Sequence, residues 1–218
     1  MKTDSLTSKA YHEIRKKILS NQFPAHTRLK EDFWAKKLMV SRIAIRESLT
    51  RLLGEGLLTT GEKGGFFVLG LNAGDVHQIR ELREILEIGA LKLAIRKVTR
   101  QQIDQLEKIC DEFRTMADRG YFNGACEADI KFHETLIKCA DNEKLFAVYV
   151  SSHIPIFHQK LGNIQIYLDD YNQSDREHRQ IVKGLKEKNL SLAQKYLIRQ
   201  FSRGETAILD LEPGEKMS

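Results

Sequence analysis

The sequence predicts a mainly α-helical protein, with an N-terminal winged helix-turn-helix domain at residues 1–70 followed by an antiparallel six-helix bundle at residues 75–212. Apolar residues recur at helical spacing through most of the 218 residues, and only 3 prolines interrupt them. The exception lies at residues 57–69, where two short apolar runs flank a glycine-containing tip. That pattern is typical of a β-hairpin. One hairpin near the N-terminus of a helical chain indicates a winged domain joined to a bundle.

The recognition helix of the winged domain is predicted within residues 40–58. Ser41 is a residue type that caps helices, and apolar side chains follow it at intervals of three and four residues. Arg42 and Arg46 stand one turn apart near the start of this helix. A recognition helix enters the major groove with its first turns against base edges and phosphates. We therefore expect Ser41, Arg42 and Arg46 to contact DNA.

Shorter elements flank the recognition helix. Residues 6–22 predict a first helix, and residues 29–38 predict a second helix that ends in a tight turn at Met39. The hairpin forms a two-stranded wing with Lys63 and Gly64 at its tip. Basic side chains and backbone N–H groups at such a tip can contact DNA phosphates.

Charge is unevenly distributed along the chain. Residues 1–70 contain 13 lysines and arginines against 7 aspartates and glutamates, a balance of +6, whereas residues 71–218 contain 22 against 23. A solvated charged surface can produce such a count by chance. A basic module joined to a near-neutral one is also the expected footprint of attraction to nucleic-acid phosphates.

Neither a membrane segment nor a disulfide framework is predicted. No run approaches the ~18 apolar residues of a membrane span, and the N-terminal residues lack the apolar region of a signal peptide. We therefore expect a cytoplasmic protein without a membrane partner. Cys110, Cys126 and Cys139 are odd in number, widely spaced and set in helical patterns, so they are expected to be reduced core residues.

The bundle is expected to begin after a boundary that contains Gly70 and Gly74. Capping boxes at Thr99 and Ser174 predict the starts of the second and fifth bundle helices, and Pro155 is expected to kink or end the fourth. The interior of an antiparallel bundle is a natural place for a ligand cavity.

Asp129 and His133 lie four residues apart in the third predicted bundle helix. This spacing places a carboxylate and an imidazole on one face of the helix, where both can hold the same metal ion. The pair is therefore a candidate for half of a metal site.

Residues 18–68 resemble the DNA-binding domain of GntR transcription regulators. In that family, a Val-Ser-Arg-x-x-Val-Arg-Glu-Ala-Leu recognition helix precedes Arg-Leu-x-x-x-Gly-Leu and a Gly-x-Phe-Val wing. The corresponding positions here are 40–42, 45–49, 51–52, 56–57 and 65–68. The resemblance implies a DNA-binding regulator.

The chain departs from the family pattern at six positions. Ile43 and Ala44 replace a common Thr-Pro pair on the groove-facing turn of the recognition helix. The loss of a hydroxyl there bears on the preferred base sequence rather than on the mode of binding. The family usually has Gly, Pro, Gly and Gly where this chain has Asn21, Ala25, His26 and Met39.

The bundle resembles the FCD effector-binding domain of the FadR branch of GntR regulators, and its six helices suit the smaller VanR-like subgroup. The resemblance is carried by residues 83–87, 129–133, Asn142 and 177–181. It implies a divalent metal, such as zinc, manganese or nickel, held by Asp129, His133 and His178. Gln200 occupies the position of a fourth histidine ligand, and its amide oxygen is the weaker ligand, so zinc affinity is expected to fall.

Two alternatives to this metal site remain open. Asp129, His133, His178 and Gln200 can form a hydrogen-bonded polar cluster, or they can line a cavity for an organic ligand without a metal. His153 and His158 are further candidate ligands for a metal ion.

Arg83 matches a family arginine that faces the effector cavity. A guanidinium binds a carboxylate through two parallel hydrogen bonds, so the resemblance implies a small carboxylate-type effector at Arg83. The alternative is a structural ion pair with Glu84, Glu87 or a neighbouring helix.

Two functions from different classes fit these observations. The first is a ligand-responsive transcription regulator, not an enzyme, that binds an inverted repeat in double-stranded DNA as a homodimer and responds to a small acidic metabolite. The second is a helical-bundle metalloenzyme, a hydrolase with a nucleic-acid-binding arm. The sequence contains no nucleophile motif, no HExxH motif and no second carboxylate cluster beside the candidate ligands, which favours the regulator.

Overall fold

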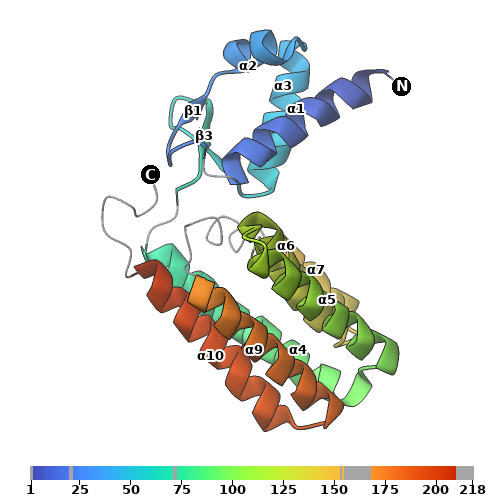
Figure 1. Ribbon diagram of the computed structural model, residues 1–218. Helices are drawn as coiled ribbons and strands as arrows, with labels where there is room; N and C mark the ends of the chain where they lie inside the picture. The colour runs from blue at the N-terminus through green and yellow to red at the C-terminus, as the bar shows by residue number, and fades with distance from the viewer. Residues whose placement is uncertain (1, 20–21, 71–72, 153, 155–167, 210–218) are drawn as a thin grey trace. The chain divides into compact units, whose positions relative to one another are not determined.

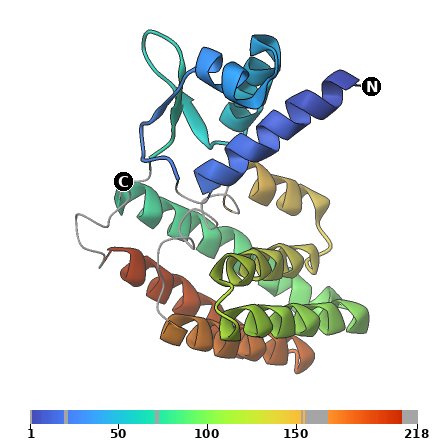
Figure 2. The ribbon, with the colours of Figure 1, turned by 45° about the horizontal axis from the view of Figure 1, so that its top comes forward.

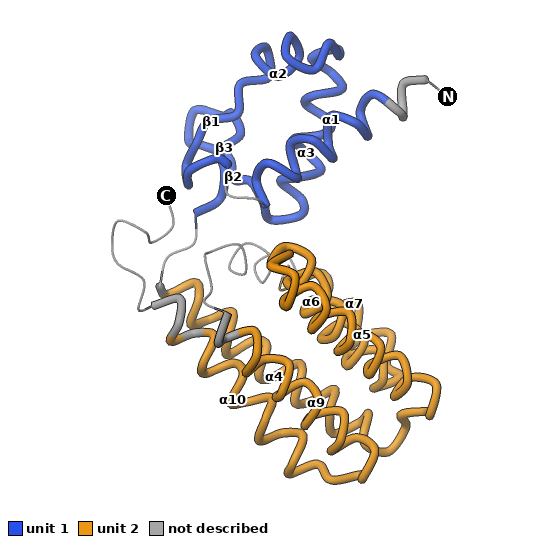
Figure 3. Tube along the Cα trace, in the orientation of Figure 1, with its two compact units in different colours: residues 1–72, 212–218 blue, residues 73–211 orange. Residues whose placement is uncertain are grey.

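The computed structural model describes residues 2–19, 22–70, 73–152, 154 and 168–209. These residues form two compact units, one within residues 1–72 and the other within residues 73–211 (Figure 3). The first unit combines helices with a small sheet, and the described part of the second unit is helical (Figure 1).

The first unit is a winged helix-turn-helix. Its β3 strand lies between β1 and β2 and is antiparallel to both. The turn between β2 and β3 projects away from the helices of this unit (Figure 2). The elements are α1 (Lys2–Leu19), β1 (Arg28–Leu29), α2 (Glu31–Leu38), α3 (Arg42–Gly54), β2 (Leu58–Thr60) and β3 (Phe66–Val68).

The predicted two-stranded wing is confirmed by the pairing of β2 with β3, and the structure adds a third strand that was not predicted. Arg28 and Leu29 form β1, which pairs with Phe67 and Phe66 of β3. Two residues are too few to show the alternation of polar and apolar side chains from which a strand is predicted. Only the pairing in three dimensions identifies this strand.

The turn between α2 and α3 depends on two local features. Met39 adopts the left-handed conformation, with φ 54° and ψ 45°. Ser41 follows in extended conformation, and its hydroxyl accepts a hydrogen bond of 3.1 Å from the backbone N–H of Ala44, which confirms the predicted helix cap. His26 also has a positive φ, 63°. Glycine adopts such a φ without strain, which gives a physical reason for the family's glycines at both positions.

The core of the first unit forms where α1 packs on α3. Fully buried side chains line this contact, and each stabilises the unit by about 1.5–3 kcal/mol relative to an exposed side chain. Burial on one side of α3 leaves the opposite side, with Arg42 and Arg46, exposed. The buried side chains include Ile14, Ile18, Ile45, Leu49 and Leu52.

The second unit is a closed ring of helices. Going round the ring, α4 packs on α10, α10 on α9, α9 on α5, α5 on α6 and α6 on α4, while α7 packs on α6 and α4 (Figure 1). One apolar core draws side chains from all five ring helices. The helices are α4 (Ala73–Lys97), α5 (Arg100–Asp118), α6 (Phe122–Lys138), α7 (Glu143–Ser151), α9 (Leu168–Lys186) and α10 (Leu190–Leu209).

One of the two predicted capping boxes is confirmed. Thr99 and Gln102 exchange the two hydrogen bonds of a capping box at the start of α5. The box predicted at Ser174 was wrong, because α9 begins at Leu168 and Ser174 lies inside the helix. Its hydroxyl instead accepts a hydrogen bond of 2.7 Å from Arg203 of α10. Pro155 lies outside the described residues.

The three cysteines are buried free thiols, as expected. Burial raises the pKa of Cys110 and Cys126 to about 12 and that of Cys139 to about 11, so all three stay protonated. No helix in the described part of the chain is both long and apolar enough to cross a membrane.

Candidate functional site

The first candidate site is the exposed face of α3. Ile43, in its first turn, is 72% exposed. The expectation that Ala44 also faces the groove was wrong, because Ala44 is only 7% exposed. It lies one turn before Ser48 on the buried side of α3, and the Ser48 hydroxyl donates to the Ala44 carbonyl. Ile43 alone therefore presents an apolar side chain where the family has a hydroxyl.

Both arginines on this face form ion pairs with the first turn of α2. Arg42 Nε lies 2.9 Å from Asp32 Oδ1, and Arg46 Nε lies 3.0 Å from Glu31 Oε1. The two arginine side chains are 62% and 67% exposed, and ion pairs whose cation is open to solvent in this way contribute about 0–1 kcal/mol. DNA phosphates can therefore replace these partners at little cost. The sequence interpretation missed this pairing, although two acidic residues in the first turn of α2 are visible in the sequence.

These four charged side chains surround a groove in the first unit. The groove has a volume of about 370 Å³ and lies between α2, the start of α3 and the sheet. Cations outnumber carboxylates along its walls, which suits an anionic ligand such as a phosphate backbone. Its other lining residues include Arg28, Lys30 and Phe66.

The tip of the wing is open to solvent. Lys63 and Gly64 are both exposed, and Gly64 has a φ of 78° that favours glycine. The Gly64 N–H donates to the Gly61 carbonyl at 2.8 Å, which closes the turn. Contact between this tip and DNA stays a prediction.

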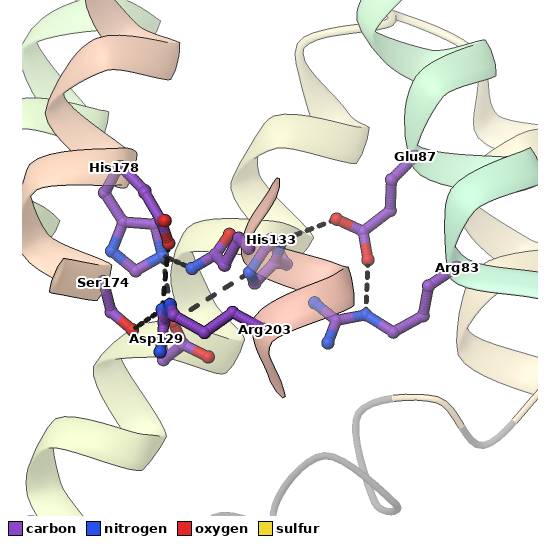
Figure 4. Close-up of polar contacts among 9 residues, drawn as sticks. Arg83, Glu87, Asp129, His133, Ser174, His178 and Arg203 are labelled. Atoms are coloured by element: carbon purple, nitrogen blue, oxygen red, sulfur yellow. Dashed lines mark hydrogen bonds and ion pairs between the residues drawn. The ribbon is translucent and has the colours of Figure 1, made fainter. Parts of the chain in front are cut away.

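The second candidate site is a polar cluster among the ring helices (Figure 4). Asp129 and His133 come from α6, His178 from α9 and Gln200 from α10. Asp129 Oδ1 lies 2.9 Å from His178 Nε2 and 3.9 Å from His133 Nε2. One ligand atom from each of these three residues lies within 4.8 Å of the other two. The structure thus brings together the four residues of the predicted metal site.

Both histidines of the cluster are fully buried, and the Asp129 side chain is 13% exposed. The alternative ligands His153 and His158 lie outside the described residues.

Two polar groups face the same ring nitrogen of His178. Its Nε2 lies 2.9 Å from Asp129 Oδ1 and 2.8 Å from the Gln200 amide nitrogen. A cation fits beside them, because a carboxylate oxygen and an imidazole lone pair both bind metal ions.

The amide of Gln200 also fits a cation. Its Oε1 is buried and has no hydrogen-bond partner among the described residues. Because the oxygen and nitrogen of an amide can exchange places by rotation, Oε1 can face the cluster instead of the nitrogen. The residues present therefore fit a divalent metal.

A second layer of contacts orients His133. Its Nδ1 lies 2.5 Å from Glu87 Oε2, and the other oxygen of Glu87 accepts from Arg83 Nε at 2.8 Å. Burial lowers the pKa of His133 to about 4 despite the adjacent carboxylate. Burial disfavours the charge of Glu87, but His133 and Arg83 outweigh it and lower the pKa of Glu87 to about 2. At neutral pH, His133 is a neutral imidazole, the form that binds metals.

Glu87 is the main residue of this site that the sequence interpretation missed, since it appeared there only as an ion-pair partner of Arg83. Its carboxylate is fully buried. A signal for it exists in the sequence, because Glu87 is flanked by the apolar Leu86 and Ile88 and stands four residues after Arg83. A charge at such a position needs buried partners.

Arg83 forms an ion pair and has a further guanidinium nitrogen that can donate a hydrogen bond. It pairs with Glu87, whereas Glu84 pairs with Arg80 at 2.6 Å. Burial opposes its charge, but Glu87 raises the pKa of Arg83. Its Nη2 is buried without a hydrogen-bond partner among the described residues, as is the hydroxyl of Tyr149. Buried donors of this kind call for a ligand or a water molecule.

Comparison with known proteins places the chain in a family. The family model for bacterial regulatory proteins of the gntR family matches residues 6–68, and the model for the FCD domain matches residues 78–202. The chain belongs to the GntR family. Its first unit is the DNA-binding part of a GntR regulator and its second is the ligand-binding FCD part, in the FadR-type arrangement. Assignment to the VanR-like subgroup stays a prediction.

Relatives of known sequence and structure agree with this membership. YdhC of Bacillus subtilis (strain 168), an uncharacterised HTH-type transcriptional regulator, is 30% identical over 199 residues, which cover 88% of this chain and 86% of YdhC. The gluconate operon transcriptional repressor of Bacillus licheniformis is 22% identical over 210 residues, or 94% of this chain and 86% of the repressor. A GntR transcriptional regulator from Rhodococcus sp. RHA1 has the same fold, with a TM-score of 0.78 at 19% identity over 95% of this chain and 99% of its own.

GntR regulators bind DNA and are not enzymes. The hydrolase alternative is therefore wrong, and the polar cluster belongs to the ligand-binding domain of a transcription regulator.

Proposed function

We propose that this GntR regulator binds a short inverted repeat as a homodimer. One recognition helix and one wing cover only a half-site, and two-fold symmetry doubles the contacts with the duplex. The exposed arginines of α3, with exchangeable partners on α2, support this mode of binding. Residues 75–212 would then bind the effector and form the dimer. The proposed DNA contacts are Ser41, Arg42, Arg46, Lys63 and Gly64.

The effector domain is proposed to hold a divalent metal, such as zinc, manganese or nickel. The observation that carries this proposal is the convergence of three ligand atoms, one each from Asp129, His133 and His178, within 4.8 Å of one another. Asp129, His133 and His178 would bind the ion, and Gln200 or water would complete its shell. When bound, the metal supplies a fixed positive charge beside Arg83 that attracts an acidic molecule.

The effector is proposed to be a small carboxylate that releases or tightens operator binding. Arg83 Nη2 is the buried donor available to it, because Nε is already bonded to Glu87. A carboxylate accepts strong, directional hydrogen bonds from a guanidinium. One relative is named for the gluconate operon, and gluconate is itself a carboxylate, which supports this ligand class.

The test starts from an operator selected out of random duplexes, followed by binding assays with small carboxylic acids, beginning with gluconate. Arg83→Leu should keep operator binding and lose the response to the active acid. Arg80→Leu is the matched control, because Arg80 lies one turn earlier on α4 and pairs with Glu84 outside the cluster. A normal response from Arg83→Leu would reduce Arg83 to its structural ion pair.

The metal is tested by calorimetric titration with zinc and manganese. Gln200→His should bind zinc more tightly than the wild type, since imidazole replaces a weak amide ligand. Gln194→His, six residues earlier on α10, should leave the affinity unchanged. Absence of binding by both the wild type and Gln200→His would leave the cluster as a polar pocket.

A further inference from the structure

Glu87 lies between the two proposed binding groups of the effector domain. One carboxylate oxygen contacts Arg83 Nε at 2.8 Å, and the other contacts His133 Nδ1 at 2.5 Å (Figure 4). None of the three side chains is more than 13% exposed. A continuous hydrogen-bonded chain therefore runs from the proposed carboxylate donor to the proposed metal ligand without passing through solvent.

The direction of each hydrogen bond in this chain is fixed by chemistry. An arginine Nε always donates, so Glu87 accepts from Arg83 at one oxygen, and the adjacent guanidinium favours the ionised carboxylate, which accepts at its other oxygen as well. The His133 ring therefore carries its proton on Nδ1. Its other nitrogen, Nε2, then has a lone pair, and it faces Asp129 and His178. Glu87 thus selects the tautomer that can bind a metal ion.

We propose that Glu87 is a positioning residue that couples carboxylate binding at Arg83 to metal binding at His133. A cation on Nε2 makes the Nδ1–H a stronger donor to Glu87. Glu87 then satisfies less of the Arg83 charge, and Arg83 Nη2 becomes a stronger donor to a bound carboxylate. By linkage, carboxylate and metal each tighten the binding of the other by the same factor. This inference rests on the proposed function and adds the residue that joins its two ligands.

Glu87→Gln tests the coupling while nearly keeping the shape of the side chain. An amide has one oxygen and one NH₂ group, so it cannot accept from both Arg83 and His133. If its NH₂ faces His133, the ring shifts its proton to Nε2 and loses the lone pair that binds the metal. Glu84→Gln is the matched control, because Glu84 lies on the same helix and also pairs with an arginine four residues away, Arg80.

The experiment titrates zinc into the full-length, chelator-treated protein, with and without acetate as the carboxylate probe and at matched ionic strength. In the wild type and in Glu84→Gln, acetate should increase the affinity for zinc. In Glu87→Gln, zinc affinity should fall by about 10- to 100-fold, and the effect of acetate should vanish. Nitrogen-15 NMR of the histidine rings should show the Nδ1–H tautomer of His133 in the wild type and its loss in the variant.

Arg83→Lys provides a second test if Glu87→Gln does not fold. Lysine keeps a positive charge beside Glu87 but lacks the second donor, so zinc affinity should stay within a few-fold of the wild type while the acetate effect is lost. The proposal is overturned if Glu87→Gln keeps the affinity or the acetate effect, because direct attraction between the metal and the carboxylate would then explain both. If acetate does not change the zinc affinity of the wild type, the coupling is overturned while the metal site stands. A wild type that binds no zinc overturns the proposed metal site itself.

Discussion

The two units hold their functional arginines in opposite ways. Arg46 of α3 and Arg83 of α4 each donate through Nε to a glutamate, at 3.0 Å and 2.8 Å. The Arg46 side chain is 67% exposed and that of its partner Glu31 16%, whereas Arg83 is 13% exposed and its partner Glu87 is fully buried. Nearly equal distances therefore conceal unequal energies, because water and salt screen the first pair and not the second. The DNA-binding face can exchange its partners, and the effector site keeps them.

Removing Glu87 should have the largest effect on stability. Glu87→Ala leaves Arg83 and His133 without their shared acceptor, and breaking a buried pair costs about 3–5 kcal/mol of the free energy of unfolding. Glu31→Ala removes the equivalent partner of Arg46 and should cost less than about 1 kcal/mol. Urea unfolding followed by helical circular dichroism reports mainly on the second unit, which contains most of the described helical residues.

Fluorescence separates the two units in this experiment. Trp34 is the single tryptophan of the chain and is buried in the first unit, so its signal should be unchanged by Glu87→Ala. Equal losses for Glu87→Ala and Glu31→Ala would show that burial does not set the strength of these pairs.

Acidification should weaken the second unit through the same buried network. The pKa of His133 falls from an ordinary 6.5 to about 4 on folding, because burial disfavours the imidazolium. Between pH 6.5 and 4, the unfolded state therefore binds a proton that the folded state does not. The contribution of neutral His133 to the free energy of unfolding is complete above pH 6.5 and is lost as the pH falls toward 4. Its size is on the order of 3 kcal/mol. Glu87, whose pKa is lowered to about 2, adds a further loss between pH 4.5 and 2.

The measurement is urea unfolding of the chelator-treated protein between pH 7.5 and pH 4, again followed by circular dichroism. His133→Gln, which cannot titrate, should flatten the profile between pH 6.5 and 4.5. An unchanged free energy of unfolding over that range in the wild type would contradict the neutral state of buried His133.

The two regions also differ in how far their sequences predict them. Ser41, Arg42 and Arg46 lie within six residues of the chain, so local spacing was enough to place them at the N-terminal end of α3. The partners of the buried site come from four helices, α4, α6, α9 and α10, and only two i,i+4 pairs share an element: Arg83 with Glu87, and Asp129 with His133. His178 and Gln200 were placed beside them by family resemblance rather than by spacing.

Contacts between elements account for what was missed. In the sequence, Glu87 is one of several charged residues of a helix. Its partner His133 comes from another helix, α6, and is identified only by the packing of α6 on α4. The capping box at Ser174 failed for the opposite reason, because a local motif was taken as a helix start where the helix was already formed. Local sequence patterns predict local structure. Packing between elements that are distant in the sequence decides which charged side chains become buried and paired.

The DNA-binding face should respond differently to two cations. Arg46→Ala should cost about 1–3 kcal/mol of operator binding and reduce sequence discrimination, if Arg46 reads a guanine edge. Lys63→Ala should weaken all duplexes alike and reduce the dependence on salt, because a wing lysine acts through phosphate. Both are measured by titrating operator and unrelated duplexes at several salt concentrations. Unchanged operator binding by Arg46→Ala at matched salt would rule out α3 as the recognition helix.

The smallest expected effect concerns the backbone of the turn between α2 and α3. Met39 leads into α3 with a φ of 54°, and its side chain is 87% exposed. An exposed side chain gives little packing energy to offset the left-handed conformation, which disfavours a non-glycine residue by roughly 1–2 kcal/mol. Met39→Gly removes this strain but makes the unfolded chain more flexible, so a net gain of about 1 kcal/mol or less is expected.

Trp34 fluorescence during urea unfolding measures this gain in the first unit. Met39→Ala is the matched control, because it removes the same side chain and keeps the strained Cβ, so it should bring no gain. A loss of stability in Met39→Gly would show that the exposed methionine packs in solution and that the turn is not strained. A gain would show that the DNA-binding unit carries strain in its turn while its ion pairs stay weak, in contrast to the effector unit, where the buried charges determine stability.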